Sequence, residues 1–139
     1  MQKILILLMM CMPVVAQSRD SLKKKYGEPI SESFLVKSGI IVTATYSPTG
    51  EIAELLIAPQ TTDIIKSRSK TLAREAVKEI LLTLVPLSER GRLTSSAFIN
   101  LFCLPANDCL GSAEDYEKVT IYFNGSKDGV NYAVVQWRK

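Results

Sequence analysis

The feature that most constrains the fold is one amphipathic segment, residues 68–85, which has strand-like sequence on both sides. Apolar side chains recur along it at helical spacing, and charged residues such as Arg74, Glu75 and Lys78 occupy the opposite side. Pro86 ends the pattern, because proline cannot continue a helix. A helix with one broad apolar face needs a sheet to cover it, so the segment predicts an α+β domain.

Six segments around this helix have the composition of β-strands. They are residues 30–36, 40–46, 51–58, 97–103, 116–123 and 130–137. Segment 40–46 is the clearest because it is rich in β-branched residues, and Pro48 and Gly50 after it suit a tight turn. Segment 116–123 alternates, with its Val, Ile and Phe side chains predicted on one face. The predicted fold class is α+β, with an antiparallel sheet of about five to six strands packed against one main amphipathic helix.

A short N-terminal helix is expected over residues 18–26, because Gly27 is typical of the position that follows a helix. The Tyr-Gly-Glu-Pro motif of residues 26–29 then joins this helix to the first strand. Because of this motif and this order of elements, residues 20–59 resemble small exported α-β-β-β modules. These are the modules of the outer-membrane assembly lipoprotein and β-lactamase-inhibitor-like type. The resemblance implies an exported α+β module. It transfers no functional residue, and the chain lacks the acylated cysteine motif of those modules.

The N-terminal residues have the pattern of a secretory signal peptide. Lys3 precedes the apolar run 4–12, and small residues up to Ala16 suit a cleavage site. An uncleaved membrane anchor is the alternative, but a spanning helix needs about 20 apolar residues and this run is far shorter. We therefore expect residues 1–16 to be removed, which leaves residues 17–139 as a single α+β domain in the periplasm or outside the cell.

The cysteines agree with export. Cys11 lies in the leader, so the mature domain keeps Cys103 and Cys109, with five residues between them. A cysteine pair in an exported domain predicts a disulfide, which here would pin a loop of low apolar content. A redox-active pair is the alternative, but such pairs are usually spaced C-x-x-C. We expect a structural disulfide.

The charge balance argues against a dedicated nucleic-acid binder. Lys and Arg total 17 against 14 acidic residues, for a net charge of +3, which is not the footprint of a polyanion-binding protein. We expect membrane contact to be weak at most. One basic stretch is a candidate anion site because it precedes and opens the main helix, where free N–H groups favour anions. It comprises Lys66, Arg68, Lys70 and Arg74, and a solvated loop is the alternative.

Histidine is absent from the chain, which excludes His-based triads, His zinc sites and the commonest general base near neutral pH. No cluster has the spacing of a metal site, so we expect no metal, no cofactor and no catalytic residue. A Ser-Lys pair within residues 67–70 would support a hydrolase-like enzyme instead. Carboxylates that meet in space, such as Glu114, Asp115 and Glu117, would do the same.

Four aromatic residues near the C-terminus form a candidate partner surface. They are Tyr116, Tyr122, Tyr132 and Trp137. Tyr and Trp combine a large contact area with a polar group and are favoured at recognition surfaces. The alternative is that these rings pack against the helix or complete the second face of the sheet. Asn124 also begins a glycosylation sequon, which matters only in a eukaryotic secretory pathway.

These observations favour an exported, non-enzymatic binding or accessory domain that uses the sheet face or a cleft between sheet and helix. Its partner would be another envelope protein or a small ligand. The alternatives are a small histidine-free hydrolase-like enzyme and a structural envelope protein. An exposed aromatic patch would favour the binding domain, whereas two close carboxylates with raised pKa values would favour the enzyme.

Overall fold

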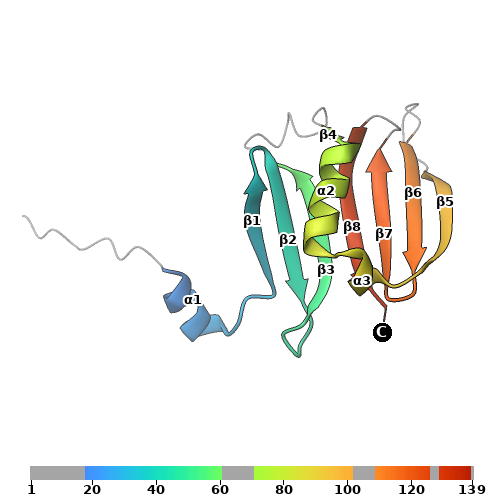
Figure 1. Ribbon diagram of the computed structural model, residues 1–139. Helices are drawn as coiled ribbons and strands as arrows, with labels where there is room; N and C mark the ends of the chain where they lie inside the picture. Colours follow the sequence, from blue (N-terminus) through green and yellow to red (C-terminus); the bar gives the residue numbers. More distant parts are fainter. Residues whose placement is uncertain (1–17, 61–70, 102–108, 126–128, 139) are drawn as a thin grey trace, which may run out of the picture.

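The computed structural model describes residues 18–60, 71–101, 109–125 and 129–138. Within these ranges the chain forms three helices and eight strands (Figure 1). In chain order the elements are α1 (Arg19–Tyr26), β1 (Ser31–Lys37), β2 (Ile40–Tyr46), β3 (Ile52–Pro59), β4 (Leu72–Ala73), α2 (Arg74–Leu84), α3 (Leu87–Arg90), β5 (Leu93–Leu101), β6 (Cys109–Tyr116), β7 (Val119–Gly125) and β8 (Gly129–Trp137).

The strands form one antiparallel sheet in the order β1-β2-β3-β8-β7-β6-β5. It consists of two meanders that meet in the middle, β1 to β3 on one side and β5 to β8 on the other (Figure 1). The last strand of the sheet in sequence therefore lies at its centre, beside β3. The two-residue β4 also pairs with β8, through Leu72↔Val130 and Ala73↔Gly129.

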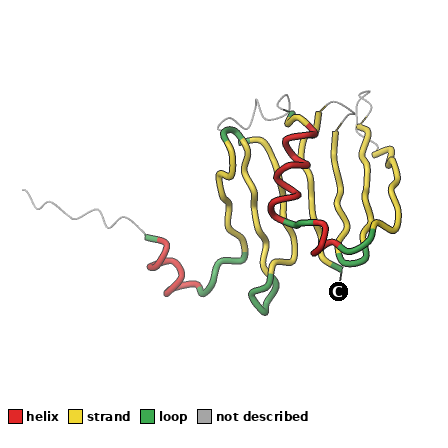
Figure 2. Tube along the Cα trace, viewed as in Figure 1, coloured by secondary structure: helices red, strands yellow, loops and turns green. Residues whose placement is uncertain are grey.

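Helix α2 crosses one face of the sheet over its central strands (Figure 2). Its side chains Val77, Ile80 and Leu81 are buried against that face. The strands contribute every second residue to the same core. The buried strand residues in this cluster include Ile40, Val42, Leu55, Ile57, Val119, Ile121, Phe123, Ala133 and Val135. The predicted alternation of the segment that forms β7 is confirmed.

The α+β class and the antiparallel sheet with one main helix are confirmed, but the predicted number of strands was too low. The prediction missed β4 and β6. β6 contains Gly111, Ser112, Glu114 and Asp115, residue types that are uncommon in strands. It is nevertheless paired along its length with β5 on one side and with β7 on the other. Ladder pairing on both sides outweighs the weak intrinsic preference of this segment.

The main helix is shorter than predicted. It was expected from residue 68, but α2 begins at Arg74, and the residues just before it form β4. Leu72 points into the core from that strand, which gives it the buried position that helical spacing also predicts. At the other end the Val85 N–H donates to the Leu81 carbonyl at 2.9 Å, and Pro86 follows. Residues 61–70 lie outside the described part of the chain.

Helix α1 confirms the predicted N-terminal helix. The Ser18 hydroxyl caps it by accepting a hydrogen bond from the Ser21 N–H at 3.2 Å, and Gly27 ends it with a φ of 92°. None of its residues is buried. Figure 1 shows that α1 stands apart from the sheet, joined to it by a short linker before β1.

Candidate functional site

The face of the sheet opposite α2 is not covered by any helix in the described part of the chain, and we call it the open face (Figure 2). Cross-strand partners share a face. Tyr122 lies opposite Val134, and Val134 lies opposite Leu56, so these three side chains belong to the open face. Tyr132 lies opposite Asn124, two residues further along the same pair of strands. The two tyrosines are therefore diagonal neighbours on β7 and β8.

A hollow of about 320 Å³ opens on this face and is lined by both tyrosines and by Val134. Tyr122 is 39% exposed and Tyr132 is 40% exposed, so each ring is partly packed and partly free for contact. Gly111 on β6 lies opposite Asn124 and has no side chain to fill the space beside it. The result is an apolar floor flanked by two half-exposed phenol rings.

Polar side chains line the rim of the hollow in fixed positions. The Gln136 amide donates to a Glu54 carboxylate oxygen at 2.8 Å. The Asn131 amide donates to the Asn124 side-chain oxygen at 2.9 Å. Glu54, Asn124 and Gln136 all line the hollow, so its rim offers hydrogen-bonding groups whose orientation is already set.

The end of the open face carries an ionised carboxylate. Asp115 accepts hydrogen bonds from the Thr120 hydroxyl at 2.8 Å, the Ser95 hydroxyl at 2.9 Å and the Arg138 guanidinium at 2.5 Å. These bonds, those from Thr120 and Ser95 first, hold the pKa of Asp115 below its usual value. Asp115 is therefore a fixed anion paired with Arg138 and is poorly suited to act as a general acid.

The predicted partner surface is only half assembled, and Tyr116 is a correction. Tyr116 is buried on the α2 side of the sheet, beneath the guanidinium of Arg90, which lies 5.5 Å from its ring centre. Its hydroxyl donates to Glu114 at 3.0 Å, and burial raises its pKa. Arg90 is itself buried and donates to the Val85 carbonyl at 2.6 Å. Tyr116 supports the core and is not available to a partner.

Trp137 is the second correction to that surface. It lies opposite Val119, a residue of the α2-side core, and it packs against this core. It also lines a separate hollow with Glu51 and Ile52 near the end of β8. Two of the four aromatic residues lie on each face of the sheet. The structure therefore brings Tyr122 and Tyr132 together on the open face and separates Tyr116 and Trp137 from them.

No family model, curated protein or solved structure matches this chain. The site is therefore interpreted from its own geometry. Among the described residues there is no group of three or more Cys, Asp and Glu side chains that could hold a metal ion. No helix within the described ranges combines the length and the apolarity needed to span a membrane.

The predicted anion site falls largely on residues that are not described. Lys66, Arg68 and Lys70 lie outside the described residues, so their role stays a prediction. Arg74 is described, and its guanidinium lies 4.8 Å from the ring centre of Phe123. It also donates to the Ser112 hydroxyl at 3.2 Å. Arg74 is the first residue of α2, and through these two contacts its side chain packs the start of the helix onto the sheet.

The disulfide also stays a prediction, because Cys103 lies outside the described residues. Cys109 is the first residue of β6, and its backbone lies opposite Leu101 at the end of β5.

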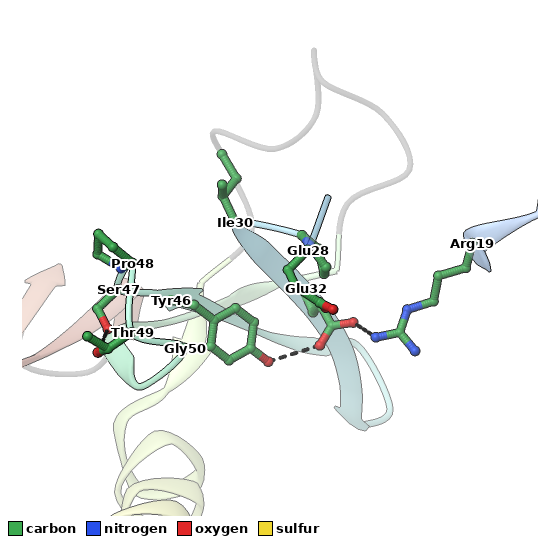
Figure 3. Close-up of a pocket in the computed structure, with 10 residues that line it drawn as sticks. Arg19, Glu28, Ile30, Glu32, Tyr46, Ser47, Pro48, Thr49 and Gly50 are labelled. Atoms are coloured by element: carbon green, nitrogen blue, oxygen red, sulfur yellow. Dashed lines mark hydrogen bonds and ion pairs between the residues drawn. The ribbon is translucent and has the colours of Figure 1, made fainter. Parts of the chain in front are cut away.

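A third hollow, of about 580 Å³, lies between Arg19 of α1 and the end of the sheet where β1 begins (Figure 3). Glu32 is at its centre and forms an ion pair with Arg19. The Tyr46 hydroxyl donates to the other Glu32 oxygen at 2.9 Å, and this bond raises the pKa of Tyr46. Glu28, which also lines the hollow, forms an ion pair with Lys23 at 2.7 Å. Both carboxylates are engaged, and the cluster joins α1 to β1.

The acidic cluster near the C-terminus does not converge. Asp115 lies on the open face, whereas Glu114 accepts from the Tyr116 hydroxyl on the α2 side. Glu117 accepts from the Arg92 N–H at 3.0 Å, which is the main reason that its pKa is lowered. The possible Ser-Lys pair of residues 67–70 lies outside the described residues.

The sequence reasoning missed two members of the open face, Leu56 and Val134. Both lie in segments that were correctly predicted as strands. Their alternation identifies two faces but does not say which strands are neighbours. The pairing of β3 with β8 joins segments that are far apart in the sequence, and no local pattern marks it.

Proposed function

We propose that this chain is an exported, non-enzymatic binding domain whose open face docks a partner in the periplasm or outside the cell. The observation that carries the proposal is the pair of half-exposed rings, Tyr122 and Tyr132, over an apolar floor on an uncovered sheet face. Tyrosine anchors of this kind supply much of the free energy of binding at protein interfaces. Their position on paired strands keeps them rigid, which lowers the entropy cost of binding.

The chemistry of the hollow favours a protein partner that presents one apolar side chain flanked by hydrogen-bond donors. The apolar side chain would lie on Val134 between the rings of Tyr122 and Tyr132. The oxygens of Glu54 and Asn124 on the rim would accept from the donors. A small ligand is the second candidate, and the hollow is near the lower end of the volume of ligand pockets. The hollow lies open to solvent, which favours the protein partner.

The carboxylates support this proposal over a hydrolase-like enzyme. The two described carboxylates with a resolved pKa shift, Asp115 and Glu117, both have a lowered pKa. A general acid near neutral pH needs a raised one. A structural envelope protein is the remaining alternative, and it predicts no loss of binding when the tyrosines are removed.

The test is a comparison of two variants with the wild-type protein in pull-downs from an envelope extract, read by quantitative mass spectrometry. The first variant is Tyr122→Ala with Tyr132→Ala. The matched control is Phe34→Ala, an aromatic residue that is 49% exposed and lies opposite the core residue Val42, on the other face. We expect at least one protein retained by the wild type and the control to be lost, by about tenfold or more, from the double variant.

The proposal is wrong if the double variant, with an unchanged circular dichroism spectrum, retains every protein that the wild type retains. It is also wrong if Phe34→Ala loses the same proteins, because the loss would then not depend on the open face.

A further inference from the structure

Strand β5 forms one edge of the sheet and pairs only with β6 among the described strands. It is nine residues long, and its register with β6 runs without irregularity from Ser95 to Leu101. An edge strand presents unpaired N–H and C=O groups along its outer side. From Ser95 to Leu101, β5 is therefore a seven-residue template in regular register on which another strand can add.

The two edges of the sheet differ in how they are protected. β1, the opposite edge, has seven residues and carries Glu32 and Lys37, which form ion pairs with Arg19 and Glu79. Charges of this kind are a common protection of edge strands. None of the nine residues of β5 is charged or proline, and residues 93–98 are all exposed. The β5 edge lacks the protection that β1 has.

An exposed aromatic ring lies beside this bare edge. Phe98 is 80% exposed, the highest exposure among the described aromatic residues. It lies opposite Ser112, whose hydroxyl accepts from Arg74 of α2, so it belongs to the helix-covered face. Figure 1 shows that α2 lies over the centre of the sheet and β5 at its far edge, beyond the helix. The ring of Phe98 is an apolar anchor without cover from α2.

We propose that β5 pairs antiparallel with β5 of a second copy of this chain, about a two-fold axis near Ala97, so that two sheets join into one. This register places Phe98 opposite Ser96 of the second copy. The two Phe98 side chains then lie on the same face as diagonal neighbours, with Cα atoms about 7 to 8 Å apart, within reach of aromatic rings. A two-fold interface of this kind is the commonest in soluble oligomers.

The charge pattern of β5 is compatible with a second copy as the occupant. Because β5 has no charged residue, self-pairing places no like charges opposite one another. The nearest charge is Arg92, and in this register the two copies of Arg92 are separated by roughly 34 Å along the strands at about 3.4 Å per residue. That distance exceeds the Debye length of about 8 Å at physiological salt, so their repulsion is screened.

The test measures the mass of the purified protein by light scattering after size-exclusion chromatography, over a range of micromolar concentrations. We expect a dimer for the wild type. Phe98→Lys places two ammonium groups beside each other at the joint and should weaken dimerisation by about tenfold or more. The matched control is Phe34→Lys on β1, an aromatic residue at the other edge and on the same face, and it should remain a dimer.

A monomeric wild type at every concentration would overturn the proposal, as would a Phe98→Lys variant that dimerises like the wild type. Phe98 is mostly exposed, so its variant should keep the melting temperature of the monomeric fold. The proposed register is tested by disulfide cross-linking, because it places the two copies of Ala97 opposite each other. Ala97→Cys should form a covalent dimer in the absence of reductant, and Ser33→Cys on β1 should not. The opposite result would overturn the β5 pairing. In the pull-down described above, Phe98→Lys should retain the same proteins as the wild type. This result would show that the β5 interface and the open face act independently.

Discussion

The two faces of the sheet are built from the same strands, yet their side chains have different roles. On β7, Phe123 is 2% exposed beneath α2, whereas its neighbour Tyr122 is 39% exposed on the open face. Successive side chains of a strand point to opposite faces, so one position in the sequence separates the two environments. The comparison teaches that the buried core and the exposed open face are built from neighbouring positions of one strand, so that each can be changed without the other.

The polar groups of the two faces follow the same division. Arg90 is buried on the helix-covered side, where it depends on the Val85 carbonyl and the Tyr116 ring. Asp115 lies at the rim of the open face, where hydroxyl groups and Arg138 hold its charge. Substitutions at these positions test whether the difference between the faces holds for polar residues as well.

The largest effect is expected from the core residue of β7. Phe123→Ala should lower the free energy of unfolding by about 3 to 5 kcal/mol, because it leaves a cavity beneath α2 and removes the ring under Arg74. Tyr122→Ala, one residue away on the open face, should cost about 1 kcal/mol or less. Urea unfolding of both variants measures the difference. Equal losses would show that the open face is as tightly packed as the covered one.

A smaller loss is expected at Arg90. Arg90→Ala removes a buried hydrogen bond from a charged group and should cost about 2 to 3 kcal/mol. Arg90→Met keeps an unbranched aliphatic side chain in the buried space and should cost about half as much. One nitrogen of the guanidinium is buried without a hydrogen-bond partner, which limits the net contribution of this side chain. Thermal unfolding of the two variants gives the order, and a more stable Arg90→Ala would contradict it.

The smallest effect is expected at Asp115 and depends on pH. Its pKa is lowered on folding, so its contribution is present above its ordinary value of 3.8 and is lost as the pH falls through the folded-state pKa. Asp115→Asn should therefore melt below the wild type at neutral pH, and the gap should close on acidification below about pH 4. Glu75→Gln, on the exposed side of α2, is the control with the same change in charge. A gap that stays constant with pH would show that the Asp115 charge is not involved.

Local patterns predicted most of the elements, because each depends on residues that are close in the sequence. β2 has the bounds that its β-branched run predicted, and α1 ends at Gly27 as expected. β6 was missed because its glycine, serine and acidic residues resemble a loop, and only its two neighbouring strands hold it in the sheet. The start of α2 was misplaced because Leu72 and Ala73 fit a helical pattern but pair with β8.

The positions of the aromatic residues on the two faces were predicted in part for the same reason. Alternation correctly indicated that Tyr122 faces away from the core residues of β7. It could not show that Tyr116 belongs to a different strand, because the chain reverses direction between β6 and β7. It could not show that Leu56 lies next to Val134 either, since that contact joins two separate meanders.

The amino-acid pattern alone was sufficient for the α+β class, the main helix and the two-sided character of the strands, because hydrophobic periodicity is a local property. The order of the strands, the identity of the uncovered face and the bare edge at β5 came only from the folded chain. They depend on which distant segments form hydrogen bonds with each other, and the free energy of such pairing is set by the whole core and not by any one segment.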